Sequence, residues 1–239
     1  MKQRHTTRVA DVLCRFYPPY AWIPTVVIPV YNVLVFYGTR LINRYYPAHI
    51  FELPIDRAIP FVPFFVLFYI LAYLQWGLCY FFTLRRNRRL CAETFSVNLI
   101  AKTVCLVCFL VFPTAIVRPE VTGGGVWNTL VRWIYASDLP DNLFPSIHCI
   151  ESWLAFRALL KVEEIPLPVR IANGVLTLFV CASTVLVKQH YLPDVFAGIL
   201  TVELGYLLTR LLGTDRRLRS LEPAAARRCP DLIPDTRSD

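Results

Sequence analysis

One stretch of this sequence, residues 61–84, runs for 24 positions without an Asp, Glu, Lys or Arg. At a rise of about 1.5 Å per residue, a helix of this length crosses the hydrocarbon core of a bilayer. Five other apolar runs lie along the chain, some interrupted by prolines or by one or two charges. We therefore expect six transmembrane segments, at 20–41, 61–84, 95–117, 146–160, 171–187 and 195–209.

The composition excludes a soluble globular protein. Hydrophobic residues make up 56% of the 239 residues and charged residues only 18%, whereas soluble domains carry about a quarter charged residues. The net charge of +8 could indicate a nucleic-acid partner, but the basic residues sit at the ends of apolar runs, as membrane topology requires. We expect an all-α, polytopic six-helix transmembrane bundle without a nucleic-acid partner. Its oligomeric state stays open.

The distribution of Lys and Arg predicts the orientation. With both termini in the cytoplasm, eighteen of the 25 basic residues fall in inner segments and six in outer segments, as the positive-inside rule requires. The expected organisation is a cytoplasmic tail (1–19), a membrane catalytic domain (20–212) and a disordered basic tail (213–239). No cleavable signal pattern precedes the first span, which predicts a multi-pass protein of the plasma membrane.

The charged residues Lys102, Glu151 and Glu203 lie in apolar surroundings. A lone charge at such depth costs about 3 kcal/mol or more. We therefore expect these side chains to be paired inside the bundle. Glu151 also follows His148 by three positions, so it could touch the site described next.

Two polar stretches at span ends carry the candidate chemistry. Pro145 suits a first helical turn, which leaves the backbone donors from Ser146 to His148 at a positively polarised helix end that can bind an oxyanion. About forty residues later, His190 and Asp194 lie four positions apart. On a helical turn the carboxylate could fix the imidazole tautomer and make the free nitrogen a nucleophile. A phosphate held between the two stretches could be attacked.

These stretches, together with Arg118 and Pro119 at the end of the third run, resemble the type 2 phosphatidic acid phosphatase superfamily. Its three motifs are Lys-x6-Arg-Pro, Pro-Ser-Gly-His and Ser-Arg-x5-His-x3-Asp. The third motif begins here at Ser183, and its spacing to His190 and from there to Asp194 fits. The resemblance covers residues 95–209. It implies a helical membrane enzyme with its active site at the extracytoplasmic face.

The resemblance also implies roles for individual residues. His190 would be the nucleophile that forms a phosphohistidine, Asp194 the carboxylate that orients it, and His148 the general acid that protonates the leaving oxygen. No metal or other cofactor is implied, so chelators are expected to leave the activity unchanged. The expected ligands of the phosphate oxygens are Arg118, Ser146 and Ser183.

The sequence departs from the motifs at two cationic positions. Val111 stands where the first motif has Lys, and Thr184 where the third has Arg. Lys188 lies four residues after Thr184, and on a continuous helix it could place its ammonium near the missing guanidinium. These losses, and the run from Asp138 to Asn142, also resemble the sphingomyelin and inositol-phosphorylceramide synthase branch.

The expected function is therefore a phosphoric ester hydrolase: a metal-independent phosphatase of a membrane lipid phosphate or diphosphate. One alternative is a lipid phospho-group transferase of the synthase branch, and another is a lipid-binding or lipid-moving protein with eroded motifs. A zinc site at His148, His190 and Asp194 is possible by ligand type. A serine hydrolase using Ser146 lacks the Gly-x-Ser-x-Gly turn. The sequence does not name the lipid substrate or the acceptor.

Overall fold

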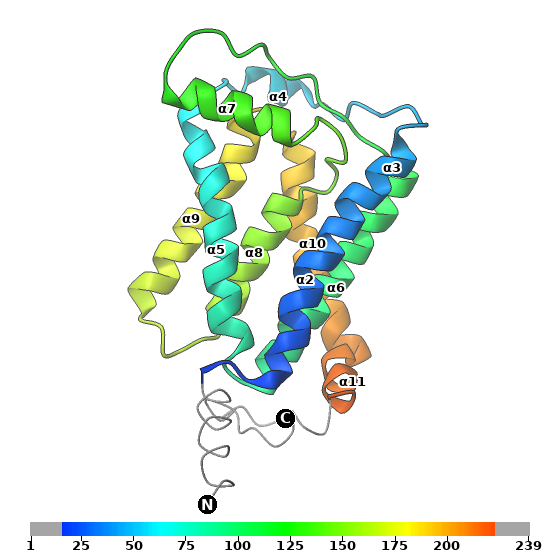
Figure 1. Cartoon of the computed structure of the whole chain (residues 1–239), viewed down its shortest axis with the longest axis vertical. Coiled ribbons are helices and arrows are strands. Elements are labelled where there is room, and N and C mark those ends of the chain that lie inside the picture. Colours follow the sequence, from blue (N-terminus) through cyan, green and yellow to red (C-terminus); the bar gives the residue numbers. More distant parts are fainter. Residues whose placement is uncertain (1–15, 223–239) are drawn as a thin grey trace, which may run out of the picture.

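The computed structural model describes residues 16–222, and the regular secondary structure in this range is helical throughout, which confirms the all-α class (Figure 1). The helices, in chain order, are η1 (Pro19–Ala21), α2 (Trp22–Val33), η2 (Leu34–Gly38), α3 (Thr39–Asn43), α4 (Pro54–Ala58), η3 (Pro63–Phe65), α5 (Val66–Leu84), α6 (Arg88–Val111), α7 (Val126–Ser137), α8 (Ile147–Leu159), α9 (Leu167–Leu186), α10 (Leu192–Leu212) and α11 (Thr214–Ser220).

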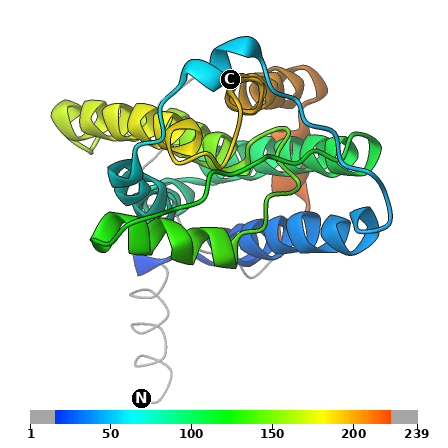
Figure 2. The same ribbon diagram turned by 90° about the horizontal axis from the view of Figure 1, so that it is seen from above.

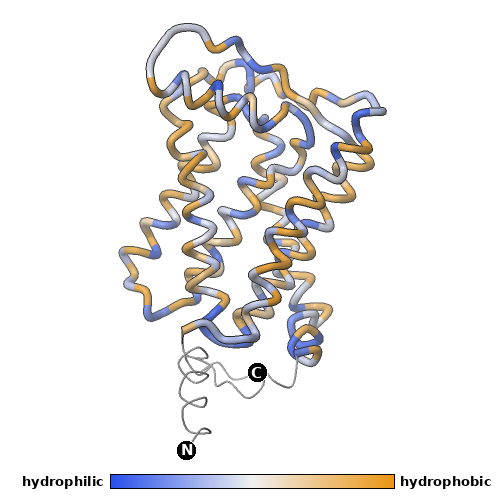
Figure 3. The backbone as a smooth tube through the Cα atoms, in the orientation of Figure 1, coloured by the Kyte–Doolittle hydropathy of each residue, from blue (hydrophilic) through white to orange (hydrophobic). Residues whose placement is uncertain are grey.

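Five of the six expected spans appear as helices long and apolar enough to cross a membrane. Figure 3 shows hydrophobic residues along these helices and more hydrophilic segments at the two ends of the bundle. The sixth expected span, 146–160, corresponds to α8, which has only 13 residues and is about 20 Å long. The five candidate membrane helices in the described range are Pro19–Asn43, Pro63–Leu84, Arg88–Val111, Leu167–Leu186 and Leu192–Leu212.

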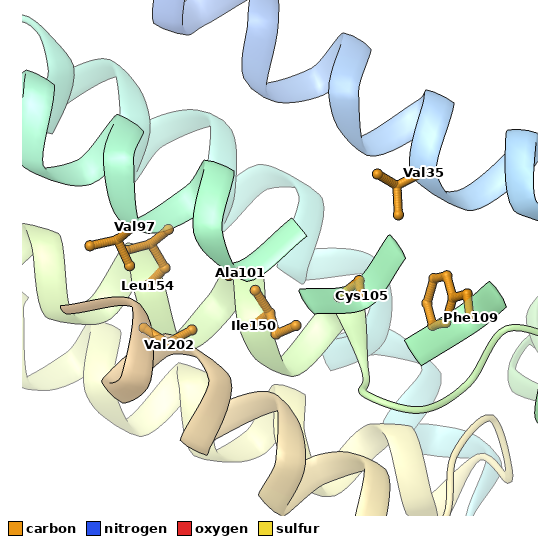
Figure 4. Packing of buried hydrophobic residues seen from close by; sticks show 8 residues of the cluster. All are labelled: Val35, Val97, Ala101, Cys105, Phe109, Ile150, Leu154 and Val202. Carbon is orange, nitrogen blue, oxygen red and sulfur yellow. The ribbon is translucent and has the colours of Figure 1, made fainter. Parts of the chain in front are cut away.

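Helix α8 forms the centre of the bundle, where it packs against α5, α6, α9 and α10. Its Ile150 and Leu154 are fully buried and meet Val97 and Ala101 of α6 and Val202 of α10 (Figure 4). Because protein rather than lipid surrounds most of α8, this helix does not need the length of a lipid-exposed span.

Local sequence sets where the helices begin and end. Asn87 caps α6, since its side chain accepts a hydrogen bond from the Leu90 amide at 2.8 Å. The third membrane helix therefore begins at Arg88, seven residues before its expected start. Pro113 follows its last turn, where a proline cannot continue the helix. At the end of α10, Gly213 adopts a left-handed conformation with φ +59°, which glycine allows without steric cost.

One end of the bundle is covered by α4 and α7 (Figure 1), which lie toward opposite sides of it in the view from above (Figure 2). Sequence analysis did not anticipate α7. The helix buries Val131 and Ile134, and its Tyr135 hydroxyl donates to the Val187 carbonyl at the end of α9, at 2.8 Å. Burial raises the pKa of Tyr135 to about 12, so at neutral pH this phenol is a neutral donor.

The charges inside the apolar runs are paired, as predicted. Lys102 Nζ lies 2.7 Å from Glu151 Oε1, and both side chains are almost completely buried. Asn98 donates to the same carboxylate. Glu203 forms an ion pair with Arg157. A buried charge costs far less when it is paired and hydrogen-bonded.

The predicted tails are described only in part. Residues 214–220 form α11, so the expectation of disorder is wrong for this segment. The side chains of α11 carry four charges over seven residues, and the helix packs against α6 and α10. Residues 1–15 and 223–239, which contain most of both expected tails, lie outside the described residues.

Candidate active site

A cavity of about 330 Å³ lies beneath α7 and contains both histidines in its wall; we call it the histidine cavity. Its walls are formed by residues of α2, η2, α5, α7 and α8, of the loop before α8 and of the loop after α9. Segments distant in sequence therefore meet around one space. Its polar and aromatic lining residues include Asn32, Tyr37, Tyr73, Trp76, Trp133, Asp138, Asp141, His148, Gln189 and His190.

His190 and Asp194 are in direct contact. His190 Nδ1 lies 3.2 Å from Asp194 Oδ2, which confirms the contact expected from the four-residue spacing. The same carboxylate oxygen accepts the Tyr191 amide at 3.0 Å, because Asp194 is the third residue of α10. Asp194 is only 1% exposed. The carboxylate thus holds the Nδ1 side of the ring and leaves Nε2 as the nitrogen available for chemistry.

His148 is enclosed by aromatic rings from α5. Its ring centroid lies 4.0 Å from that of Tyr69, 5.5 Å from Tyr73 and 5.2 Å from Trp76. These residues are four and three positions apart, so they share one helix face. Within the described part of the chain, His148 Nε2 is buried without a hydrogen-bond partner. It is a polar atom available to a ligand.

The two imidazoles lie close enough to act on one phosphorus atom. Their centroids are 6.5 Å apart and their planes meet at 56°. In-line phosphoryl transfer needs a nucleophile and an acid on opposite sides of phosphorus, with reacting atoms about 3–3.5 Å apart. Both rings line the same cavity, so a phosphoryl group bound there could contact both.

Arg118 lies beside this pair but is engaged with protein groups. Its Nη1 donates to the Asp138 carbonyl at 2.7 Å and to the Tyr135 carbonyl at 3.3 Å, at the end of α7. Its Nη2 donates to Gln189, the neighbour of His190. Burial lowers the pKa of Arg118 and the Asp138 carboxylate opposes this shift; arginine stays charged in either case. Arg118 therefore acts on the cavity through Gln189 and its charge.

The two serines expected to bind phosphate have other partners. Ser146 is fully buried; its amide donates to the Asp194 carbonyl at 3.0 Å, and its hydroxyl accepts the Cys149 amide at 3.4 Å as the cap of α8. The Ser183 hydroxyl donates to the Val180 carbonyl at 2.6 Å within α9. Neither residue lines the histidine cavity. Ser146 instead joins the start of α8 to the start of α10.

The structure corrects the expectation for Lys188. Helix α9 ends at Leu186, and Lys188 has φ +53°, so the continuous helix that would bring its ammonium close to Thr184 does not exist. The ammonium donates instead to the carbonyls of Asp56 and Ile59, at 3.1 and 2.6 Å. Lys188 thus holds the segment around α4 and does not line the cavity.

Two residues at the cavity, Arg40 and Gln189, were missed by sequence analysis. Arg40 of α3 binds Asp141 at 2.6 Å and lies 3.7 Å from Asp138; these carboxylates line the cavity. Gln189 connects Arg118 to the same wall. The run containing Asp138 and Asp141 was visible as a motif, but nothing in the sequence indicates that Arg40 reaches it from about a hundred residues away.

Residues 16–222 contain no group of three or more His, Cys, Asp or Glu side chains placed to hold a metal ion, so His148, His190 and Asp194 do not form the zinc site considered above. Comparison with models of known protein families and with curated proteins finds no match for this chain.

Proposed function

We propose that this protein is a membrane enzyme that cleaves a lipid phosphate ester through a phosphohistidine at His190. The observation that carries the proposal is the pair of imidazoles in one cavity, 6.5 Å apart, with a buried carboxylate on one of them. A lone histidine at a helix end has many structural uses. A second histidine facing the same space, with an unpartnered nitrogen, is the arrangement that phosphoryl transfer needs.

The first half-reaction forms the bond between His190 Nε2 and phosphorus and breaks the bond between phosphorus and the lipid oxygen. The electron pair of the broken bond leaves with that oxygen, which takes a proton from His148. Asp194 stabilises the positive charge that develops on the His190 ring. The charge of Arg118 lies behind Gln189, where it favours the anionic phosphoryl group.

In the second half-reaction water attacks phosphorus and gives its proton to His148. The bond between phosphorus and His190 breaks, and its electron pair returns to the ring nitrogen. Phosphate is released and both histidines regain their starting protonation. This sequence is that of a lipid phosphate phosphatase, which we take as the first candidate.

A transferase is the second candidate, and a second cavity favours it. A largely apolar cavity of about 380 Å³ lies between α2 and α5 and shares Asn32 and Trp76 with the histidine cavity. Such a space could hold the apolar part of an acceptor lipid. A lipid or sugar hydroxyl would then replace water in the second half-reaction, and a new phosphodiester would form.

The proposed orientation follows from the basic residues. We propose six membrane crossings, with α8 as the sixth, and both termini on the cytoplasmic side. The histidine cavity would then face the exterior of the cell membrane. In support, α8 runs antiparallel to α6 and α9, the long helices before and after it in the membrane order, as alternating crossings require (Figure 1).

Trapping of the covalent intermediate tests the proposal. Purified protein in lipid nanodiscs is mixed with a lipid phosphate labelled in its phosphate group and quenched within a single turnover. We expect label on the protein that is stable to base and labile to acid, as a phosphohistidine is. His190→Gln is expected to carry none. The matched control is His49→Gln, which changes a histidine whose ring stacks on Phe112 outside the cavity.

The released product separates the candidates. Free phosphate supports the phosphatase, and a labelled phosphodiester that appears only with added alcohol supports the transferase. If wild type and His190→Gln release label equally poorly from every lipid while both bind it, both enzyme candidates fail and a lipid-binding role remains.

A further inference from the structure

The charges lining the histidine cavity are unusual for a phosphate site. The lining residues include two carboxylates, Asp138 and Asp141, and among the described residues no Lys or Arg lines it. The nearest arginines are already bound: Arg40 by Asp141 at 2.6 Å, and Arg118 by Gln189 and two backbone carbonyls. A phosphate ester with no other charge would approach carboxylates that repel it.

The Asp138 side chain lies near the charges of Arg40 and Arg118 but, within the described residues, makes no hydrogen bond to either. Its Oδ1 lies 3.7 Å from Arg40, beyond hydrogen-bond distance, and its Oδ2 accepts the Tyr69 hydroxyl at 3.0 Å. Its side chain is 26% exposed. Tyr69 stacks on His148, so this negative charge is fixed one residue away from the proposed general acid.

Aromatic rings surround the same space. Tyr73 and Trp76 of α5 and Trp133 of α7 line the cavity with Asp138, and the Tyr73 and Trp76 rings are 4.9 Å apart. Exposed Trp and Tyr side chains also occur at membrane interfaces as anchors. Here, in contrast, Tyr73, Trp76 and Trp133 share one cavity with a carboxylate and with both histidines. Aromatic faces next to a carboxylate bind ammonium and quaternary ammonium groups.

We propose that Asp138, Tyr73, Trp76 and Trp133 bind a cationic group of the substrate. The substrate class is then a lipid phosphate ester that carries an ammonium within a few bonds of phosphorus. This inference rests on the proposed function, since it assumes that the phosphorus lies between the histidines. Two kinds of lipid carry this chemistry: a phosphomonoester of a long-chain amino alcohol, and a phosphodiester with an amino-alcohol headgroup.

Competing substrates test the inference. Wild-type protein in nanodiscs is given a sphingoid-base 1-phosphate, a phosphatidylcholine or phosphatidic acid, and kcat/KM is measured for each. We expect one of the two ammonium-bearing lipids to exceed phosphatidic acid by about tenfold or more, since a desolvated cation–π contact favours the cationic lipid. The preferred one identifies the source of the ammonium. Preference for phosphatidic acid over both overturns the inference.

Substitution of the carboxylate separates binding from structure. Asp138→Asn keeps an acceptor for Tyr69 and is expected to abolish most of the preference, with the ammonium-bearing lipid losing about tenfold and phosphatidic acid little or nothing. An equal loss for both lipids would mean that Asp138 only supports the fold, and would overturn the proposal. Glu120→Gln, which removes an exposed negative charge in the loop before α7, is the matched control and is expected to leave the preference intact.

A binding measurement keeps this inference separate from the proposed function. If no lipid is turned over and no adduct forms, the proposed function fails. Quenching of tryptophan fluorescence by dihexanoyl phosphatidylcholine, compared with dihexanoyl phosphatidic acid, still reports on the cation site. Tighter binding of the choline lipid by wild type than by Asp138→Asn supports it, and equal binding by the two proteins overturns it.

Discussion

His148 combines burial with an unusual aromatic enclosure. It is 7% exposed and touches three rings of α5, yet its Nε2 has no partner in the described range. The stacked face of the Tyr69 ring favours a protonated imidazole, whereas burial disfavours it. A protonated imidazole in such surroundings readily gives up its proton once a leaving oxygen arrives.

The leaving group tests this role. We expect His148→Gln to lower kcat/KM for a lipid phosphate by about 10²- to 10⁴-fold, the usual contribution of a general acid. With an aryl phosphate, whose leaving group departs without a proton, the loss should be much smaller. The measurement is initial rates on both substrates. Loss of equal size on both substrates would assign His148 to phosphate binding instead of proton transfer.

The buried ion pair joins Lys102 of α6 to Glu151 of α8, which lies three residues after His148. Removing one partner leaves an uncompensated charge, so Glu151→Gln or Lys102→Met alone is expected to lower the unfolding free energy by about 3–5 kcal/mol. The double variant should recover much of the loss. Thermal unfolding in detergent measures all three. Arg57→Gln is the control, because the Arg57 side chain is 77% exposed in its pair with Glu52; no recovery in the double variant would contradict the prediction.

The sequence could predict these residue-level features only in two cases. Either the partners are close along the chain, or an unpaired buried charge would cost too much free energy. The contact of His190 with Asp194 follows from a four-residue spacing, and the pairing of Lys102 follows from the cost of a lone buried charge. Arg40 and Asp141 are a hundred residues apart and only the fold brings them together. Lys188 was misplaced because the helix was assumed to continue.

At the scale of elements, the close approach of α10 to α8 positions the site. A Cβ at Gly198 would lie 2.9 Å from the Ser146 carbonyl oxygen and 3.0 Å from Cys149 Cβ. Ser146 caps α8 and donates its amide to Asp194 of α10. Contact between these two helices therefore sets the position of His148 relative to Asp194.

A pair of glycine substitutions tests this contact. Gly198→Ala is expected to cost about 1–3 kcal/mol of stability, as overpacking does, and to lower turnover because α8 must shift. Gly77→Ala is the matched control in a membrane helix, with nothing within 4 Å of the new Cβ, and should be neutral or slightly stabilising. Thermal unfolding and phosphate release are measured for both. Equal behaviour of the two variants would mean that the helices can separate without consequence.

Long apolar helices were predicted from the sequence, whereas short or polar helices were missed. Five long helices match five predicted spans because 20 or so apolar residues have few other ways to fold in a membrane. Helix α7 was missed because it is short, has polar residues at a third of its positions, and lies where a loop was expected. Helix α11 was missed because its composition resembles a disordered tail, although its first turn contacts α6: Thr214 hydrogen-bonds to Ser96.

At the scale of the whole molecule, the proposed topology can be tested by labelling single cysteines. Gly124→Cys in the loop before α7 and Glu163→Cys between α8 and α9 both lie at exposed positions. We expect a membrane-impermeant maleimide to label Gly124→Cys in intact cells and Glu163→Cys only after permeabilisation, because α8 crosses between them. Wild-type protein is the control, because it shows how much label the native cysteines take up. Labelling of both positions in intact cells would exclude the sixth crossing.

The short length of α8 has a consequence for the substrate. Leu159 near its last turn shares a cluster with Leu90 at the start of α6, so the two helices are level at that end. Helix α6 has 24 residues and α8 has 13, which at about 1.5 Å per residue leaves α8 roughly 16 Å short at the other end. The histidines therefore lie in a recess, below the level at which α6 ends. Under the proposed function, a lipid substrate would lower its headgroup into that recess while its chains stay in the bilayer, so the protein would not need to extract it.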